Sequence, residues 1–162
     1  MSTQVGIWSV GGPLPIRVQR GRLALEVDLE SWADAQPSIL TEGLQVVARQ
    51  LHVEAGRIDL LCLDAKARWV IVEFKRDRLY RETIAQAIDY AACVQAMAPD
   101  GLRSAIASGM ERLANPDSVL DAVDYQIRSE GDERDVSIIV VGTGVDPGME
   151  RVVKYLDKFR IP

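Results

Sequence analysis

Two acidic residues and a lysine interrupt apolar stretches in the segment GRIDLLCLDAKARWVIVEFK, which runs from Gly56 to Lys75. Asp59 lies in the first apolar stretch, and the triplet Glu73-Phe74-Lys75 ends the second. Charged side chains are expensive to bury unless they are paired or bound to a metal. Because oxygen ligands without His or Cys favour Mg²⁺ or Mn²⁺, these residue types point to a site for a divalent cation and a phosphate.

A β-hairpin would bring these residues together. Residues 58–63 and 69–75 are rich in Val, Ile, Leu and Trp, and the short segment 64–68 between them is mostly polar. A turn centred on Lys66 sets the register of the two strands. The facing pairs are then Asp59 with Glu73, Leu61 with Ile71, and Arg57 with Lys75.

Side chains that face each other across two strands share one face of the sheet, with Cβ atoms ~4.5–5.5 Å apart. Lys75 follows Glu73 by two residues, so it projects from the same face. The opposite face of the hairpin is expected to be entirely apolar. Its members are Ile58, Leu60, Cys62, Val70, Val72 and Phe74.

Two carboxylates at this spacing repel each other unless a cation lies between them. A bound metal ion would stabilise charge on a phosphate and lower the pKa of a water molecule. Lys75 could orient or deprotonate that water, or stabilise the developing charge. The pattern predicts phosphodiester hydrolysis. The alternative is a surface hairpin with ordinary solvated charges, since such triplets are common.

The segment resembles the PD-(D/E)xK nuclease superfamily. The stretch GRIDLL…VIVEFKR is similar in particular to the catalytic domain of NucS/EndoMS-type endonucleases. The resemblance runs from about residue 30 to residue 90, and more loosely to the end of the chain. Gly56-Arg57 before Asp59 and Gln86-x-x-x-Tyr90 after Lys75 make the match more specific than the triplet alone. The resemblance implies an α/β fold with a restriction-endonuclease-like core, a mixed central β-sheet flanked by helices, and metal-dependent cleavage of nucleic acid.

Carried over by position, Asp59 and Glu73 would bind Mg²⁺ or Mn²⁺, and Lys75 would be the catalytic lysine. The family also places an acid on the first helix. Glu30 is the first choice and Glu42 the alternative, and Glu30 is equally explained as an acid favoured by the dipole of a helix start.

Gln86 and Tyr90 are four residues apart, so they share one face of a helix. The resemblance favours a pair of side chains that faces the catalytic site. A solvated Gln86 and a Tyr90 at the edge of the core would also fit the spacing.

The formal net charge is −5, whereas nucleic-acid-binding proteins usually carry a basic surface. The segment from Lys66 to Arg81 nevertheless holds six basic residues against two acidic ones. A basic run is usually a solvated face, but this run adjoins the predicted metal site. We expect it to contact nucleic acid weakly and in a salt-sensitive way. DNA is favoured over RNA, but the sequence does not distinguish the two. The residues expected to make these contacts are Arg57, Arg76, Arg78 and Arg81.

The remaining pattern predicts alternating strands and helices around the hairpin. Val136–Val141 is apolar, as strands inside an α/β sheet are, and Gly142–Gly148 (GTGVDPG) is expected to be a turn that leads into a helix. The other expected elements are short strands within 5–27, a helix at 29–35, a strand at 44–53, a long helix at 80–97, helices within 101–128, and a last helix at 149–159.

The chain has 162 residues, of which 48% are hydrophobic, which fits one domain with a sizeable core. We expect a single nuclease-like domain, with N-terminal strands at 1–27 and the core at 28–162. The chain ends where an α/β pattern would begin another strand, which predicts a piece of a longer protein that has a further C-terminal domain. A homodimer stays open.

No stretch is apolar for long enough to cross a membrane. Cys62 and Cys93 lack metal-ligand spacing and are expected to be reduced in a cytoplasmic protein. His52, the one histidine, has no recognisable dyad partner. Trp8, Trp32 and Trp69 are expected to be packing residues, with Trp69 partly exposed at the turn end of the hairpin.

Three functions remain open from the sequence. The favoured one is a Mg²⁺- or Mn²⁺-dependent endodeoxyribonuclease. The second is a nuclease-like module without activity that binds DNA or assembles a larger repair or defence protein. The third is a nucleotide-binding regulator that uses the turn at 142–148, although this turn matches neither of the common phosphate-loop patterns.

Overall fold

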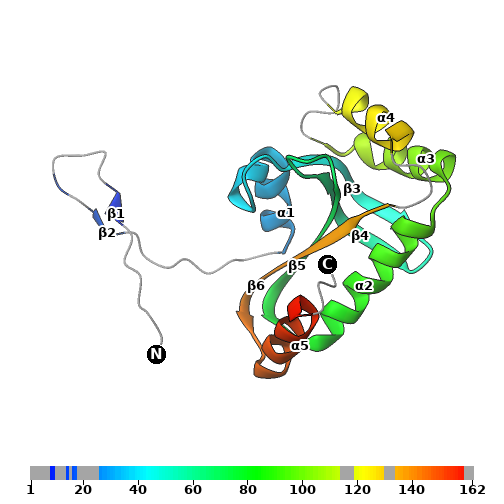
Figure 1. Cartoon of the computed structure of the whole chain (residues 1–162). Coiled ribbons are helices and arrows are strands. Elements are labelled where there is room, and N and C mark those ends of the chain that lie inside the picture. The colour runs from blue at the N-terminus through cyan, green and yellow to red at the C-terminus, as the bar shows by residue number, and fades with distance from the viewer. Residues whose placement is uncertain are drawn as a thin grey trace.

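A four-stranded mixed sheet forms the centre of the computed structural model, which describes residues 8, 9, 14, 16, 17, 26–113, 119–129 and 134–158. Three antiparallel strands follow one another in the chain, and the fourth runs parallel to the third. The strands are β3 (Gln45–Val53), β4 (Gly56–Leu63), β5 (Trp69–Leu79) and β6 (Val136–Val145), in that order across the sheet. Helices flank the sheet (Figure 1). The predicted α/β fold is therefore confirmed.

The helices lie close to the positions that the sequence predicts, but the first one begins three residues before the expected Leu29. They are α1 (Glu26–Ala35), a 3₁₀ turn (Pro37–Ile39), α2 (Arg81–Ala96), α3 (Pro99–Met110), α4 (Leu120–Ser129) and α5 (Pro147–Lys158). Near the N-terminus, β1 (Trp8–Ser9) pairs antiparallel with β2 (Ile16–Arg17). The strands expected within 5–27 are wrong for Glu26 and Val27, which belong to α1. Apart from Leu14 and the residues of β1 and β2, the rest of this range lies outside the described residues.

Helix ends are fixed by proline and by side-chain contacts. Pro99 and Pro147 stand at the first positions of α3 and α5, where a missing N–H costs nothing. The Asp146 side chain accepts the N–H of Gly148 at 2.8 Å. At the C-terminal end of α2, the buried Arg134 guanidinium donates to the carbonyl oxygens of Val94 and Met97, both at 2.7 Å. Arg134 therefore satisfies carbonyl groups that a helix end leaves unpaired.

The hairpin of β4 and β5 has the predicted register. Leu61 pairs with Ile71, and the neighbouring pairs run from Leu60 with Val72 to Leu63 with Trp69. The Asp64 carboxylate closes the turn by accepting the N–H groups of Lys66 at 2.8 Å and Arg68 at 2.9 Å. A side chain that bonds to its own turn in this way favours a tight connection.

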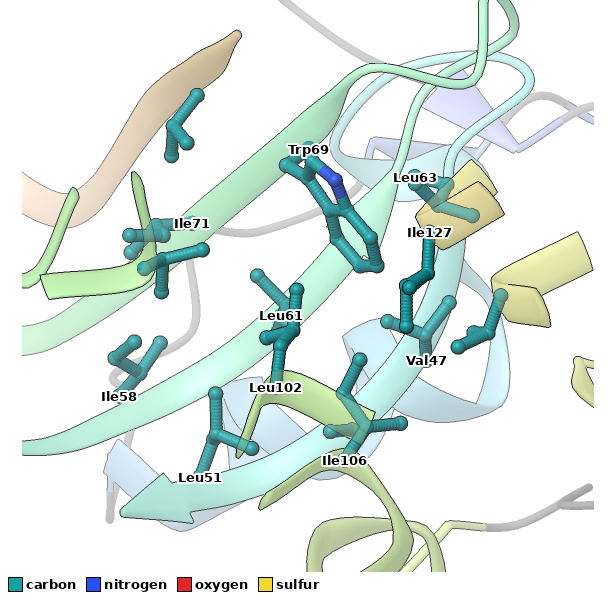
Figure 2. Packing of buried hydrophobic residues seen from close by; sticks show 14 of the residues in the cluster. Val47, Leu51, Ile58, Leu61, Leu63, Trp69, Ile71, Leu102, Ile106 and Ile127 are labelled. Carbon is teal, nitrogen blue, oxygen red and sulfur yellow. The ribbon is translucent and has the colours of Figure 1, made fainter. Parts of the chain in front are cut away.

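Apolar side chains pack on both faces of the sheet. One cluster joins β3, β4 and β5 to α2, α3 and α4, and Figure 2 shows the Trp69 indole within it. The expected partial exposure of Trp69 is wrong, because this side chain is 0% exposed. A second cluster on the α1 side contains Leu60, Cys62, Val70, Val72 and Phe74, which is the predicted apolar face without Ile58.

Ile58 belongs instead to the first cluster, which corrects the predicted composition of the apolar face. Its partner on β3 is Leu51, from the same cluster, whereas Leu60 pairs with Arg49. Gln50, between Arg49 and Leu51, has a φ of 54°. A left-handed residue departs from strand geometry, so strict alternation of faces does not hold around Gln50 and the neighbouring Ile58.

Three further expectations fail at the periphery. In the described sheet β6 lies at an edge, not inside, and Gly142, Thr143 and Gly144 continue this strand instead of forming a turn. Trp32 is 56% exposed on α1 and does not pack in the core, while the Trp8 side chain lies outside the described residues.

Cys62 is buried, Cys93 is partly exposed, and both are free thiols. Across the described part of the chain, no helix is both long and apolar enough to span a membrane.

Close packing of α3 against β3 requires Gly109. A Cβ atom at this position would lie 2.8 Å from the Cβ of Ala48 and 3.2 Å from the Arg49 carbonyl oxygen. Gly109→Ala is therefore expected to lower the free energy of unfolding by about 1–3 kcal/mol, because overpacking forces backbone shifts. Urea denaturation measures this change.

Gly101→Ala in the same helix is the matched control. Its Cβ would meet only the Met97 Cγ, at 3.4 Å, so the higher helix propensity of alanine should leave stability unchanged or raise it by up to about 1 kcal/mol. Equal effects of the two substitutions would show that α3 can move away from β3 without loss.

Candidate active site

The carboxylates of Asp59 and Glu73 meet just past the last backbone pair of β4 and β5. Beyond the pair of Leu60 with Val72, side chains join the two strands. The Phe74 N–H donates to the Asp59 Oδ2 atom at 2.9 Å, and the Asp59 N–H donates to the Glu73 Oε1 atom at 3.4 Å. Each acid is thus oriented by the backbone of the other strand. This is the proximity that the predicted register requires.

Both carboxyl groups are nearly inaccessible, with Asp59 9% exposed and Glu73 1% exposed. Burial raises the pKa of Asp59 to about 6, and the charge of Glu30 raises it too, against the lowering effects of the Phe74 N–H and of Lys75. Burial also raises the pKa of Glu73 to about 7, with a further contribution from the charge of Asp59 and an opposing one from Lys75. Two buried acids that resist ionisation form a site suited to a cation.

Lys75 lies beside this pair, as its spacing from Glu73 predicts. Its Nζ atom is 3.5 Å from Glu73 Oε2 and 3.9 Å from Glu26 Oε1. The other oxygen of Glu26 accepts the N–H of Arg76 at 2.8 Å. Glu26 therefore ties the start of α1 to β5 and faces the ammonium group.

Glu26 was missed from the sequence, because the helix was expected to begin three residues later. An acid in the first turn of a helix is stabilised by the helix dipole. This preference could have identified Glu26 if the helix had been predicted to begin at residue 26. Glu30, the expected helix acid, is 7% exposed. Its Oε2 atom accepts the Gln50 Nε2 at 2.5 Å and lies 3.5 Å from the Arg49 Nη2. The alternative, Glu42, is exposed in the turn before β3.

Gln86 and Tyr90 of α2 both line the cavity that holds the two acids. The Gln86 Nε2 donates to the Tyr90 hydroxyl oxygen at 2.7 Å, and the N–H of Arg57 donates to the same oxygen at 3.4 Å. Gly56 has a φ of 146°, and a Cβ there would lie 2.9 Å from this hydroxyl. The backbone of Gly56 and Arg57 thus packs against Tyr90, which in turn is bonded to Gln86.

An open cavity of about 600 Å³ surrounds the acidic pair. Its wall comes from α1, α2, β3, β4 and β5. The lining residues are Glu26, His52, Val53, Gly56, Arg57, Asp59, Glu73, Lys75, Gln86 and Tyr90. His52 is the second residue missed from the sequence, because it has no partner at a recognisable spacing and reaches the cavity only through the pairing of β3 with β4.

A second cavity of about 480 Å³ shares Glu26 and Lys75 with the first. Arg76, Arg78 and Tyr80 line it, so three of the four expected nucleic-acid contacts, counting Arg57, lie in the two adjoining cavities. Arg81 is absent from both linings, and its exposed side chain is 3.4 Å from Glu82 Oε1. The two adjoining cavities, called the groove below, therefore place three arginines and Lys75 beside the two buried acids, and such cations suit a phosphate-containing polymer.

Few side chains in the cavity could bind a metal ion. Among the residues that the structure describes, no group of three or more His, Cys, Asp and Glu side chains could hold a metal ion. The candidate ligands are therefore the two carboxylates of Asp59 and Glu73. Mg²⁺ is commonly held by one or two carboxylates, with water and substrate phosphate completing its shell, so this pair fits such an ion.

Comparison with known proteins assigns the chain to a family. The family model of the "Endonuclease NucS C-terminal domain" matches residues 25–110, just over half of the chain, including every residue that lines the larger cavity. The endonuclease NucS of Methanocaldococcus jannaschii is 32% identical over 50 residues, which are 31% of this chain and 19% of that protein.

Solved structures show the same fold. A repair endonuclease from Pyrococcus abyssi superposes with a TM-score of 0.53 at 14% identity, over 85% of this chain and 46% of that one. EndoMS in a complex with double-stranded DNA gives a TM-score of 0.53 at 16% identity, over 87% of this chain and 46% of that one. The chain thus spans less than half the length of these relatives.

Proposed function

Because the chain belongs to the endonuclease NucS C-terminal domain family, we propose that it is a metal-dependent endonuclease domain of the PD-(D/E)xK type that hydrolyses phosphodiester bonds of DNA. One observation carries the proposal. Two buried acids on neighbouring strands are held together by backbone hydrogen bonds, with an ammonium group 3.5 Å from one of them, at the wall of an open cavity.

Asp59 and Glu73 would hold Mg²⁺ or Mn²⁺. Their raised pKa values fit this role, because an ion would offset both the burial and the mutual repulsion that disfavour the charged forms. When bound, such an ion stabilises charge on a phosphate and lowers the pKa of a water molecule. Glu30, held by Arg49 and Gln50, acts on Asp59 through its charge.

Lys75 would orient the attacking water or stabilise the charge that develops on the phosphate through its ammonium group, or would accept the proton of the water as the neutral amine. Glu26 and Glu73 hold its ammonium group from two sides, so the lysine is positioned before substrate arrives. Gln86 and Tyr90 would position Asp59 through the Tyr90 contact with the backbone of Gly56 and Arg57.

Arg57, Arg76 and Arg78 would contact the phosphate backbone along the two adjoining cavities, and Arg81 would reach it from its exposed position. EndoMS was solved with double-stranded DNA, which supports DNA as the ligand. The net charge of −5 predicts that binding weakens steeply as salt increases. A homodimer and a further domain remain predictions from the sequence.

A DNA-binding module without nuclease activity is the second candidate. One observation favours it: the described residues offer two carboxylate ligands and no group of three. Such a module would bind DNA without turnover.

Metal titration separates the two candidates. The purified chain is incubated with labelled single-stranded and duplex DNA, and with RNA of the same sequence, in chelator, Mg²⁺, Mn²⁺ or Ca²⁺. We expect DNA to be cut with Mg²⁺ or Mn²⁺ and to stay intact in chelator, with RNA cut more slowly or not at all. DNA that is bound but uncut at every concentration of Mg²⁺ and Mn²⁺ would support the binding module and refute the nuclease.

A further inference from the structure

His52 and Arg57 lie side by side on the wall of the larger cavity. They are direct partners on the antiparallel strands β3 and β4, so their side chains share one face, with Cβ atoms about 4.5–5.5 Å apart. Both residues are exposed, and both line the cavity that contains Asp59 and Glu73.

The backbone that carries this pair is well fixed. The next pair of β3 and β4 is Val53 with Gly56, so a two-residue turn, Glu54-Ala55, closes the hairpin directly beyond it. The N–H of Arg57 donates to the Tyr90 hydroxyl oxygen at 3.4 Å. A short hairpin that contacts α2 in this way fixes the backbone positions of both residues relative to the acids.

Neither side chain has a hydrogen-bond or ion-pair partner among the residues that the structure describes. Two other cations of the groove differ in this respect. Lys75 is held by Glu73 and Glu26, and Arg76 lies 3.2 Å from Asp77 Oδ2. The donors of His52 and Arg57 are therefore available to a ligand that enters the cavity.

We propose that His52 and Arg57 form a phosphate subsite, which binds the backbone phosphate next to the one that is cleaved. This inference rests on the proposed nuclease function and adds a contact that the acids and Lys75 do not make. An arginine presents a planar fork of N–H donors that matches a phosphate, and an imidazole adds an N–H donor from the neighbouring strand. The proposed function assigns the scissile phosphate to the acidic pair and Lys75, so the neighbouring phosphate is the one left for His52 and Arg57 on the wall of the same cavity.

The test measures DNA binding in chelator, where no cleavage occurs, for His52→Ala, Arg57→Ala and the double variant. Each single change is expected to weaken binding roughly three- to tenfold, and Arg57→Ala should reduce the slope of log affinity against log salt by about 1. His52→Arg, unlike His52→Ala, keeps an N–H donor at this position, so its DNA affinity should be close to that of the unchanged protein. If the role of His52 were purely structural, this substitution would not preserve the affinity. Arg128→Ala, an exposed arginine of α4 that pairs with Asp124, is the matched control and should bind as the unchanged protein does.

A DNA strand with one neutral methylphosphonate locates the subsite. Moving the substitution along the strand should find one position, adjacent to the cut, where binding by the unchanged protein weakens and binding by the double variant does not. If the double variant binds as the unchanged protein does while that protein cleaves DNA, the subsite is wrong and the nuclease stands. If the variants lose affinity but no metal supports cleavage, the nuclease is wrong and the phosphate contact stands. If the unchanged protein binds no DNA, both proposals fail.

Discussion

Asp59→Asn and Glu73→Gln are each expected to abolish metal-dependent DNA cleavage while the protein stays folded. The amide oxygens can still accept the N–H groups of Phe74 and of residue 59, which the carboxylates accept at 2.9 and 3.4 Å. The negative charge that would hold Mg²⁺ or Mn²⁺ is lost, so the rate should fall by at least about a thousandfold. Single-turnover cleavage in Mn²⁺ measures the rate, and circular dichroism confirms the fold.

Lys75→Met should give a different result from the two acid substitutions. It removes the ammonium group that lies 3.5 Å from Glu73 and leaves both carboxylates in place. We expect kcat to fall by about 10²- to 10⁴-fold while the protein still binds the metal ion in calorimetry. Loss of metal binding in this variant would show that Lys75 supports the acids and does not act on the reacting groups.

Asp64→Asn in the turn of the same hairpin is the control for these exchanges. Asp64 accepts N–H groups of Lys66 and Arg68 and lines neither cavity of the groove. Its substitution should leave cleavage near the unchanged rate. Cleavage that survives in Asp59→Asn or Glu73→Gln would place the chemistry at another site or in a contaminant.

The facing of the two acids could be predicted because two signals agree on the register. The alternation of apolar residues sets which side chains share a face, and the short polar turn sets which residues face each other. Asp64 strengthens this turn through hydrogen bonds within the hairpin itself. Local interactions of this kind are encoded in neighbouring residues, so the sequence alone is sufficient.

The role of Glu26 depends on contacts between distant parts of the chain. Its carboxylate accepts an N–H of Arg76, which is 50 residues away, and this contact helps to fix the start of α1. The apolar spacing used to place the helix begins only at Leu29. The sequence pattern therefore leaves Glu26 outside the predicted helix, and the resemblance to the family points to Glu30 or Glu42 as the helix acid.

Ile58 and His52 show a second kind of limit. A glutamine gives no sign that it will adopt the positive φ of 54° seen at Gln50, so the change of face at Ile58 cannot be predicted from alternation. His52 has no partner nearby in the sequence, and only the pairing of β3 with β4 brings it next to Arg57. Similarly, the apolar run of β6 cannot distinguish an edge strand from a central one.

Without metal, the protein is expected to lose stability as the pH rises through the range in which Asp59 and Glu73 ionise. Burial is the main cause that raises the pKa of Asp59 from 3.8 to about 6 and that of Glu73 from 4.5 to about 7. Between the unfolded and folded pKa values the folded state binds more protons than the unfolded state, so its stability falls with rising pH. At about 1.4 kcal/mol per pKa unit, each group costs roughly 3 kcal/mol above pH 7. The two costs overlap, because the charge of Asp59 contributes to the shift of Glu73.

Asp59→Asn should therefore make the metal-free protein more stable at pH 8, by about 1–3 kcal/mol. The variant keeps an oxygen for the Phe74 N–H and loses the charge that burial disfavours. The difference should shrink towards pH 4, where the unchanged carboxyl group is protonated in the folded state. Urea titrations in chelator across this pH range measure the effect. Saturating Mn²⁺ should then stabilise the unchanged protein more than the variant, because only a folded site with both carboxylates binds the ion tightly.

Asp64→Asn provides a control of opposite sign on the same hairpin. Burial raises the pKa of Asp64, but hydrogen bonds from the N–H groups of Arg68 and Lys66 and from the Arg68 guanidinium outweigh it, and the pKa is lowered. A carboxyl group of this kind stabilises the folded state above its unfolded pKa, and this contribution is lost as the pH falls. Asp64→Asn should thus destabilise the protein at pH 8 and have little effect in acid. If Asp59→Asn destabilised the metal-free protein at pH 8 as Asp64→Asn does, the ionised acids of the cavity would not oppose folding. The argument that a cation binds between them would then be wrong.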